Sequence, residues 1–208
     1  LYAGLAATID VVLGTAIAYI VWRTKLVGRK FLDYAAMGAL AIPGVVIGIG
    51  YLRTFYEFNV PYVDKPLASW WVIIVVALAI RRLPYALRAC VAALQQISVA
   101  LEEAAENLGA TKSRTVRRIV VPLMTGGILA GFVTSFATAS VELSATIMLV
   151  STRADAPLAY GIYEFMQAAA GRGPGAALGI IAVIIVGLGT YASHRIIEHG
   201  KQKQSAAP

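Results

Sequence analysis

Five long apolar stretches constrain the fold of this chain more than any other feature of its sequence. A helix that spans a membrane needs about 20 mostly apolar residues, and the stretches have about that length or more. The chain is 59% hydrophobic and only 14% charged, which is too apolar for an ordinary soluble domain. The sequence therefore predicts an all-α membrane protein with about five transmembrane helices. The stretches are residues 2–22, 34–52, 70–97, 123–150 and 174–197.

Two of these stretches contain residues that interrupt a simple spanning helix. Pro43 and Gly44 stand in the middle of the second stretch and predict either a local unwinding or a packing kink. Arg81 and Arg82 follow Ile80 in the third stretch. These arginines either lie at membrane depth, where they line a path or pair with an acid, or they extend to cytoplasmic phosphates.

Residues 1–200 are predicted to form one membrane domain, followed by a polar tail over residues 201–208. The loop 23–30, the segment 81–118 and the tail from Arg195 together hold 14 of the 18 Lys and Arg residues. Because basic residues gather on the cytoplasmic side of a membrane protein, we expect the C-terminus and the polar segment 98–122 to be cytoplasmic, even if Arg81 and Arg82 lie within the membrane. This distribution explains the net charge of +7 without nucleic-acid binding.

Residues 98–122 form the one long polar segment with a helical pattern. Ser98 is suited to cap a helix that places Glu102 and Glu103 near the positive end of its dipole. Gly109 stands where a left-handed residue ends a helix, and Thr111 is suited to cap a second helix. The first helix has an apolar face, and the second carries three arginines on one face. The apolar residues are Ala100, Leu101, Ala104, Ala105 and Leu108, and the arginines are Arg114, Arg117 and Arg118.

The spacing of residues within this segment matches a known signature. Glu103-Ala104-Ala105 is followed after three residues by Gly109, and after nine more by Ile119, with Pro122 three positions later. This pattern resembles the EAA loop of permease subunits of bacterial ABC importers, although Val121 replaces the usual Leu. An amphipathic helix resting on lipid is the alternative, but lipid binding does not require these Gly, Ile and Pro offsets.

The resemblance implies a permease core in the bacterial inner membrane, with the segment 98–122 as a coupling loop that docks in a cleft of an ATPase subunit. The coupling residues would be Glu103, Ala104, Ala105, Gly109, Ile119 and Pro122. It implies two ATPase subunits, a second permease domain and an external substrate-binding protein as partners, besides membrane lipid. It also implies that the chain is not an enzyme, because ATP and Mg would bind the partner.

Glu142 is the most prominent polar residue within an apolar stretch. An acid at membrane depth costs several kcal/mol unless it faces protein or water, so it is a functional candidate. Thr138 and Thr146 are predicted to share its helix face. We expect Glu142, Thr146, Thr138, Arg81 and Arg82 to line a translocation path. The alternative is that Glu142 is a structural acid that pairs with another helix or lies near the outer surface.

The substrate is indicated only by short resemblances. Residues 142–146, ELSAT, and residues 81–89, RRLPYALRA, resemble permeases of the ferric-iron group, whose relatives carry thiamine, polyamines or phosphonates. The resemblance makes iron(III) the first expectation for the substrate.

Other classes of function have less support in the sequence. A secondary transporter or channel would need ionisable residues in several stretches and an inverted repeat, and neither is evident. Cys90, His194 and His199 are too few for a multi-residue metal site. The chain has no G-x-x-x-x-G-K-[ST] loop, so no nucleotide site or catalytic residue is predicted.

Overall fold

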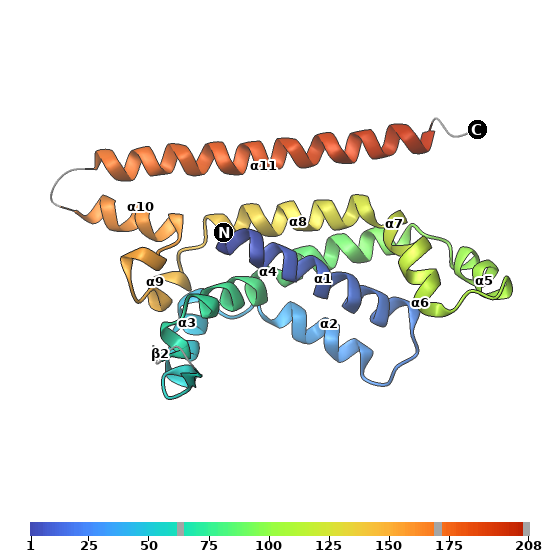
Figure 1. Ribbon diagram of the computed structural model, residues 1–208, viewed down its shortest axis with the longest axis horizontal. Coiled ribbons are helices and arrows are strands. Elements are labelled where there is room, and N and C mark those ends of the chain that lie inside the picture. Colours follow the sequence, from blue (N-terminus) through green and yellow to red (C-terminus); the bar gives the residue numbers. More distant parts are fainter. Residues whose placement is uncertain (62–64, 169–171, 206–208) are drawn as a thin grey trace.

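The computed structural model describes residues 1–61, 65–168 and 172–205, and it shows an elongated helical bundle (Figure 1). Three helices lie at its centre: α1 (Tyr2–Arg23), α4 (Trp71–Gln95) and α8 (Thr125–Ser140). They pack against one another along their lengths. The all-α membrane fold predicted from the apolar stretches is confirmed.

Small residues allow the three central helices to approach closely. A Cβ atom added at Gly14 of α1 would lie 3.1 Å from the backbone nitrogen of Leu87 in α4. A Cβ atom added at Gly131 of α8 would lie 3.1 Å from the Cα atom of Ala86. Because lipid is as apolar as a leucine side chain, helices in a membrane associate through such close packing rather than through the hydrophobic effect.

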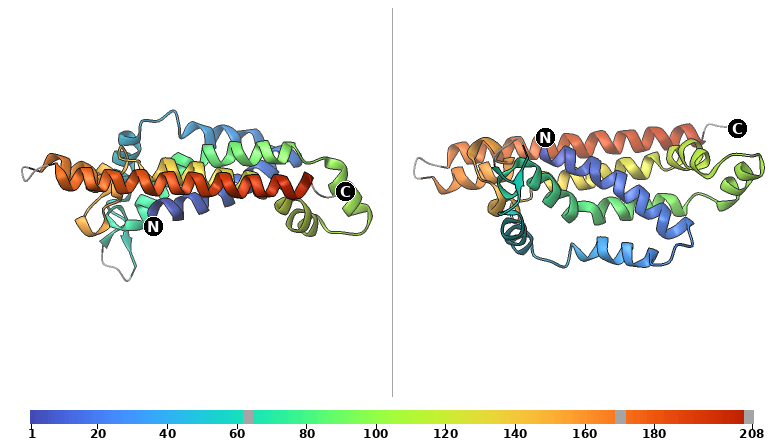
Figure 2. Two further views of the ribbon diagram at one scale, coloured as in Figure 1. Left: turned by 90° about the horizontal axis from the view of Figure 1, so that it is seen from above. Right: turned by 60° about the horizontal axis from the view of Figure 1, so that its bottom comes forward.

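The second apolar stretch is divided into two helices. α2 (Arg29–Gly38) and α3 (Gly44–Phe55) are separated by a turn that ends at Pro43, which confirms the predicted interruption. α2 lies on the side of the central helices opposite α11 (Figure 2). A short antiparallel pair of strands, β1 (Asn59–Val60) and β2 (Lys65–Pro66), and the 3-10 turn η1 (Leu67–Ser69) then lead into α4.

α4 continues without a break through Arg81, Arg82 and Pro84 for 25 residues. At about 1.5 Å per residue it extends roughly 37 Å, which exceeds the roughly 30 Å hydrocarbon core of a bilayer. The arginines therefore lie in the middle of a helix rather than beyond its end.

The segment after α4 forms a series of short helices. α5 (Val99–Asn107) and α6 (Lys112–Thr115) are followed by the π-helical turn η2 (Val116–Val120) and by α7 (Val121–Leu123). The helical axis then bends by 67° between α7 and α8.

The fourth apolar stretch is not one continuous helix, contrary to the expectation for residues 123–150. α8 ends at Ser140, and helical structure resumes in α9 (Thr146–Leu149). The carboxylate of Glu142 accepts a hydrogen bond from the backbone N–H of Ala145. An acidic side chain that bonds to a nearby backbone N–H offers the chain an alternative to helical hydrogen bonds, which explains the interruption.

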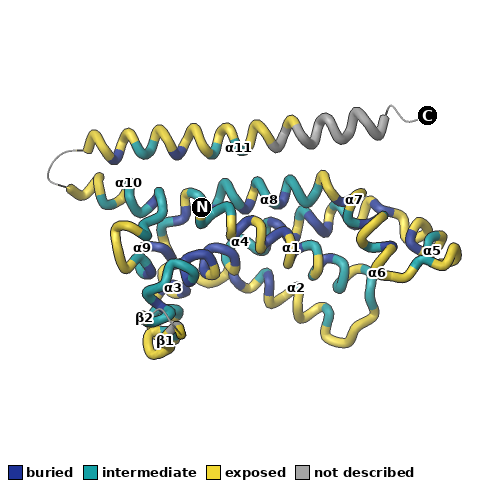
Figure 3. Tube along the Cα trace, viewed as in Figure 1, coloured by how far each residue is buried: buried dark blue, intermediate teal, exposed yellow. Residues whose placement is uncertain are grey.

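The last part of the chain forms η3 (Arg153–Asp155), α10 (Leu158–Gln167) and the long helix α11 (Gly173–Ser205). α11 packs on α8 and α10, and most of its described side chains are exposed (Figure 3). It continues into the residues predicted to be a polar tail. Residues 206–208 and the side chains of His194 and His199 lie outside the described part.

By length and composition, two described helices can cross a membrane, Tyr2–Arg23 and Gly173–Ala192, and the bent pair Lys112–Leu123 and Thr125–Ser140 raises the number to three. The remaining two apolar stretches correspond to the divided α2–α3 pair and to α4. The arginines of α4 and the break at Pro43 explain why these two stretches differ from simple spanning helices.

Candidate functional site

The candidate coupling segment, residues 98–122, comprises α5, α6, η2 and the start of α7, and its helices α5 and α6 project from one end of the bundle (Figure 1). The hydroxyl of Ser98 accepts a hydrogen bond from the backbone N–H of Ala100 at 3.3 Å, and the hydroxyl of Thr111 accepts one from Arg114 at 3.4 Å. Gly109 has a φ of 86°, in the left-handed region. The three predicted local features are therefore confirmed.

The predicted apolar face of α5 is not covered by the rest of the chain. Leu101 is 48% exposed and Leu108 is 89% exposed, and Ala104 beside them is also exposed. Glu103 points to solvent as well, whereas Ala105 is half-buried. Apolar side chains that remain exposed on a projecting helix are typical of a protein-interaction surface.

The second half of the segment connects this surface to the bundle. Gly109 and Pro122 are exposed, and Ile119 is half-buried. Ile119 lies in the π-helical turn η2, and Pro122 lies in α7, just before the 67° bend. The two residues therefore lie in the connection between the coupling segment and α8 rather than on the exposed face of α5.

The three arginines of the segment are all exposed: Arg114, Arg117 and Arg118. None of them forms an ion pair with the part of the chain that the structure describes. They add positive charge beside the apolar face of α5.

Glu102 has an environment unlike that of Glu103, the next residue. It is 7% exposed and forms a 2.7 Å ion pair with Arg23 at the end of α1. Its second oxygen accepts a hydrogen bond from the Tyr19 hydroxyl at 3.1 Å. The sequence pattern of α5 indicated only that both acids lie near its N-terminus.

A second polar cluster lies in the interior of the bundle. Glu142 is 5% exposed, and its Oε2 atom pairs with Arg82 Nη2 and lies 3.5 Å from Arg81 Nε. Arg81 also donates from Nη1 to the carbonyl of Ile42 at 2.9 Å, and the guanidinium of Arg82 lies over the ring of Tyr85. Of the alternatives that the sequence left open for these arginines, the structure shows pairing with an acid.

The two threonines assigned to this site do not share a helix face with Glu142, because α8 ends before it. Thr138 donates its hydroxyl to the carbonyl of Thr134 within α8, at 2.8 Å. Thr146 donates to the carbonyl of Glu142 at 2.9 Å. Thr146 therefore stabilises the non-helical segment around Glu142, whereas Thr138 stays within its own helix.

α3 packs against this non-helical segment through its glycines. A Cβ atom at Gly44 would lie 2.7 Å from Ser144 Cβ and 3.1 Å from Arg81 Cζ. A Cβ atom at Gly48 would lie 2.8 Å from the Ala145 carbonyl oxygen. The break at Pro43 and the break after Ser140 are thus in contact. Irregular backbone at membrane depth is tolerated where protein buries it.

Asp10 belongs to the same interior region, and the sequence analysis did not assign it to a site. Its side chain is fully buried in α1 and accepts a hydrogen bond from the Ser135 hydroxyl of α8. The positive charge of Arg82 also acts on it. The signal in the sequence was an acid within an otherwise apolar stretch, which is a functional candidate on the same grounds as Glu142.

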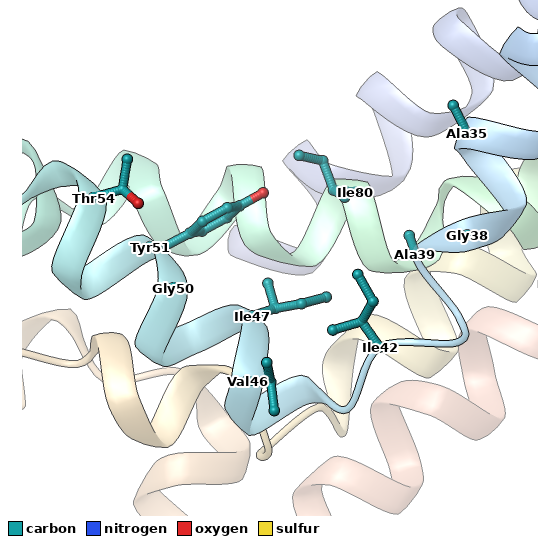
Figure 4. Close-up of a pocket in the computed structure, with 10 residues that line it drawn as sticks. All are labelled: Ala35, Gly38, Ala39, Ile42, Val46, Ile47, Gly50, Tyr51, Thr54 and Ile80. Atoms are coloured by element: carbon teal, nitrogen blue, oxygen red, sulfur yellow. The ribbon is translucent and has the colours of Figure 1, made fainter.

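An apolar groove of about 550 Å³ runs between α2, α3 and α4 (Figure 4). Tyr51 and Thr54 supply the only side-chain hydroxyls among its described lining residues, and no charged side chain lines it. The groove is therefore apolar, whereas the cluster around Glu142 is charged. It is lined by Ala35, Gly38, Ala39, Ile42, Val46, Ile47, Gly50, Tyr51, Thr54 and Ile80.

The chain is similar to known membrane transport proteins. The family described as "Binding-protein-dependent transport system inner membrane component" matches residues 10–203. The ferric transport system permease protein FbpB of Actinobacillus pleuropneumoniae is 35% identical over 162 residues, 77% of this chain. The chain spans only 23% of the length of that relative.

A shorter relative is covered more completely. The molybdenum transport system permease protein ModB of Haemophilus influenzae is 32% identical over 181 residues, which are 81% of this chain and 77% of the relative. Among solved structures, an inward-facing MetNI methionine ABC transporter matches with a TM-score of 0.73 at 16% identity, covering 95% of this chain and 90% of the other.

Proposed function

The chain belongs to the family of binding-protein-dependent transport system inner membrane components, and on that premise we propose that it forms half of the solute pathway of an ABC importer. In this proposal the coupling segment docks on a separate ATPase subunit, which binds ATP and Mg. The exposed apolar face of α5 beside three exposed arginines is the observation that carries it. A groove on a soluble partner would bury this face.

The other partners follow from the same proposal. A second permease domain would complete the pathway, and an external binding protein would deliver the solute. The coupling segment and the C-terminus are proposed to face the cytoplasm, because the loops on that side hold most of the Lys and Arg residues.

We propose iron(III), alone or with a bound anion, as the substrate. The ferric relative supports this choice, and the resemblance of residues 81–89 and 142–146 to that group agrees with it. An oxyanion is the second candidate, because a molybdenum permease is also similar. Thiamine, polyamines and phosphonates remain open through the same mechanism, and an independent secondary transporter or channel is the least supported alternative.

Co-purification tests the proposed docking. The protein would be expressed with its ATPase subunit, and the ATPase retained with it would be quantified. Leu108→Glu places a charge on the exposed face of α5 and should abolish retention. Val27→Glu, at a fully exposed position in the loop after α1, is the matched control and should retain the partner. Equal retention by both variants would exclude docking through this face.

Uptake of radioactive iron(III) and of radioactive molybdate by proteoliposomes distinguishes the two substrate candidates. Each uptake assay would contain the purified complex, the binding protein and ATP. ATP-dependent uptake of molybdate with no uptake of iron would replace the first candidate with the second.

A further inference from the structure

We propose that the guanidinium of Arg23 is the positioning group that transmits movement of the coupling helix α5 to α1 and α4. The inference rests on the proposed function, because it assumes that α5 docks on an ATPase subunit. It assigns a role to a residue outside the coupling segment, 79 positions from its partner Glu102.

Arg23 stands in the last turn of α1 and contacts two other elements. Its Nε atom donates to Glu102 Oε1 of α5 at 2.7 Å. Its Nη2 atom donates to the carbonyl of Leu94 at 3.0 Å and to the carbonyl of Ile97 at 2.5 Å. One side chain therefore joins the ends of α1 and α4 to the start of α5.

The two carbonyls lie at and just beyond the C-terminal end of α4. The last four carbonyls of an α-helix have no partner within it, and a cation near them is favoured by the helix dipole. α4 ends at Gln95, so Leu94 lies in its last turn and Ile97 lies two residues past the helix. The Leu94 carbonyl also accepts a hydrogen bond from the backbone N–H of Ile97. A guanidinium carries five donors in a planar fork, which allows it to bind carbonyls and a carboxylate together.

Glu102 completes the connection from the side of α5. Both of its oxygens are engaged by α1, one by Arg23 and one by the Tyr19 hydroxyl, and the residue is 7% exposed. The apolar face of α5 is exposed instead of packed on the bundle. The polar contacts of Glu102 therefore hold α5 to α1, while Glu103 and the apolar face stay available for a partner.

The packing of α1 against α4 near Arg23 allows a displacement of α5 to move both helices. α1 and α4 pack along their lengths and share a cluster of buried side chains near this end, which includes Ala18, Leu87, Cys90 and Leu94. Three residues, 96–98, connect α4 to α5, and Ile97 among them is buried. A displacement of α5 that keeps the Arg23 contacts must therefore move the ends of α1 and α4 with it.

The test measures solute transported per ATP hydrolysed by the complete complex in proteoliposomes. Arg23→Ala and Glu102→Gln should still retain the ATPase and hydrolyse ATP, but transport per ATP should fall at least about fivefold, the lower range for coupling between two sites. The double variant Arg23→Ala/Glu102→Gln should be no worse than Arg23→Ala, because the contact between the two residues is already lost in Arg23→Ala. Lys25→Ala removes an exposed charge two positions away and should match the wild type.

A merely structural role predicts a different result. Less complex would then be recovered, and its melting temperature would fall, while transport per ATP stayed at the wild-type ratio; this outcome overturns the inference. Multiplicative losses in the double variant also overturn it. If Arg23→Ala does not assemble, transport per ATP is measured for Glu102→Gln and Arg23→Lys instead. Wild-type transport per ATP in both of these variants overturns the inference. A wild-type complex that retains no ATPase refutes the proposed function itself, and the inference with it.

Discussion

Glu142 balances two arginines with a single buried carboxylate, and this arrangement determines what its replacement should do. Glu142→Ala leaves Arg81 and Arg82 without their acidic partner in the interior. Breaking a buried ion pair on one side costs about 3–5 kcal/mol. We expect a large decrease in the melting temperature of the detergent-purified protein, measured by the loss of its monodisperse peak on heating. Glu164→Ala is the control, because Glu164 is only half-buried and its partner Arg153 is 87% exposed.

The variant Glu142→Gln distinguishes a charge-dependent role in the path from packing. It keeps the size of the side chain and much of its hydrogen bonding. If the charge acts on a cationic solute or on the arginines as a gate, this variant should assemble and transport poorly. Transport at the wild-type rate by an intact complex would assign Glu142 to packing alone.

At the scale of single residues, the local features of the coupling segment were predictable from the sequence. The caps at Ser98 and Thr111 and the left-handed Gly109 depend on contacts within three positions of each residue. The contrast between Glu102 and Glu103 was not predictable, because burial of Glu102 depends on Arg23, which is distant in the chain. Asp10 carried the same signal as Glu142, an acid in an apolar stretch, but its partner Ser135 lies on another helix and was not predictable.

Gly109 determines how the two helices of the coupling segment meet. A bulky residue in the left-handed region costs about 1–2 kcal/mol, so Gly109→Leu should distort the bend between α5 and α6. We expect this variant to insert in the membrane but to lose most of its ATPase in co-purification. Gly109→Asn, which tolerates the left-handed conformation, should retain it. Equal retention by both variants would show that the bend is not needed for docking.

Gly14 is the point where α1 approaches the backbone of α4 most closely among the glycines of α1. Gly14→Val should push the two helices apart, at a cost of about 1–3 kcal/mol for an overpacked contact. The yield of folded protein and its melting temperature should both fall. Gly4→Val, on the same helix with no atom near its added Cβ, should change neither. Equal stability of the two variants would contradict this packing.

At the scale of elements, apolar composition predicted where helices lie but not where α8 ends. The break at Pro43 was predictable, because proline disrupts a helix locally. The end of α8 at Ser140 was not, because residues 141–150 are as apolar as a spanning helix apart from Glu142. The segment becomes irregular where Arg81, Arg82 and the backbone N–H of Ala145 hold the carboxylate.

The whole molecule has two ends that should face opposite sides of the membrane. Ser151 follows α9 and Lys112 begins α6, and both residues are exposed. These two helices lie near opposite ends of the bundle (Figure 1). A cysteine at Ser151 should react with an impermeant thiol reagent applied to intact cells, and one at Lys112 should react only after the cells are opened. Cys90 is fully buried and should not contribute background. The reverse pattern would invert the proposed orientation.

The contacts of Arg23 also have a genetic consequence. Two of its three acceptors are main-chain carbonyls, at Leu94 and Ile97, and a substitution at either residue leaves the carbonyl in place. A suppressor screen that starts from Arg23→Ala should therefore find no repair at these positions. The partners of Glu102 are the side chains of Arg23 and Tyr19. Suppressors of a Glu102 substitution can therefore arise at either of these residues. Loss of Arg23 and loss of Glu102 therefore differ in where a second mutation can restore the contact.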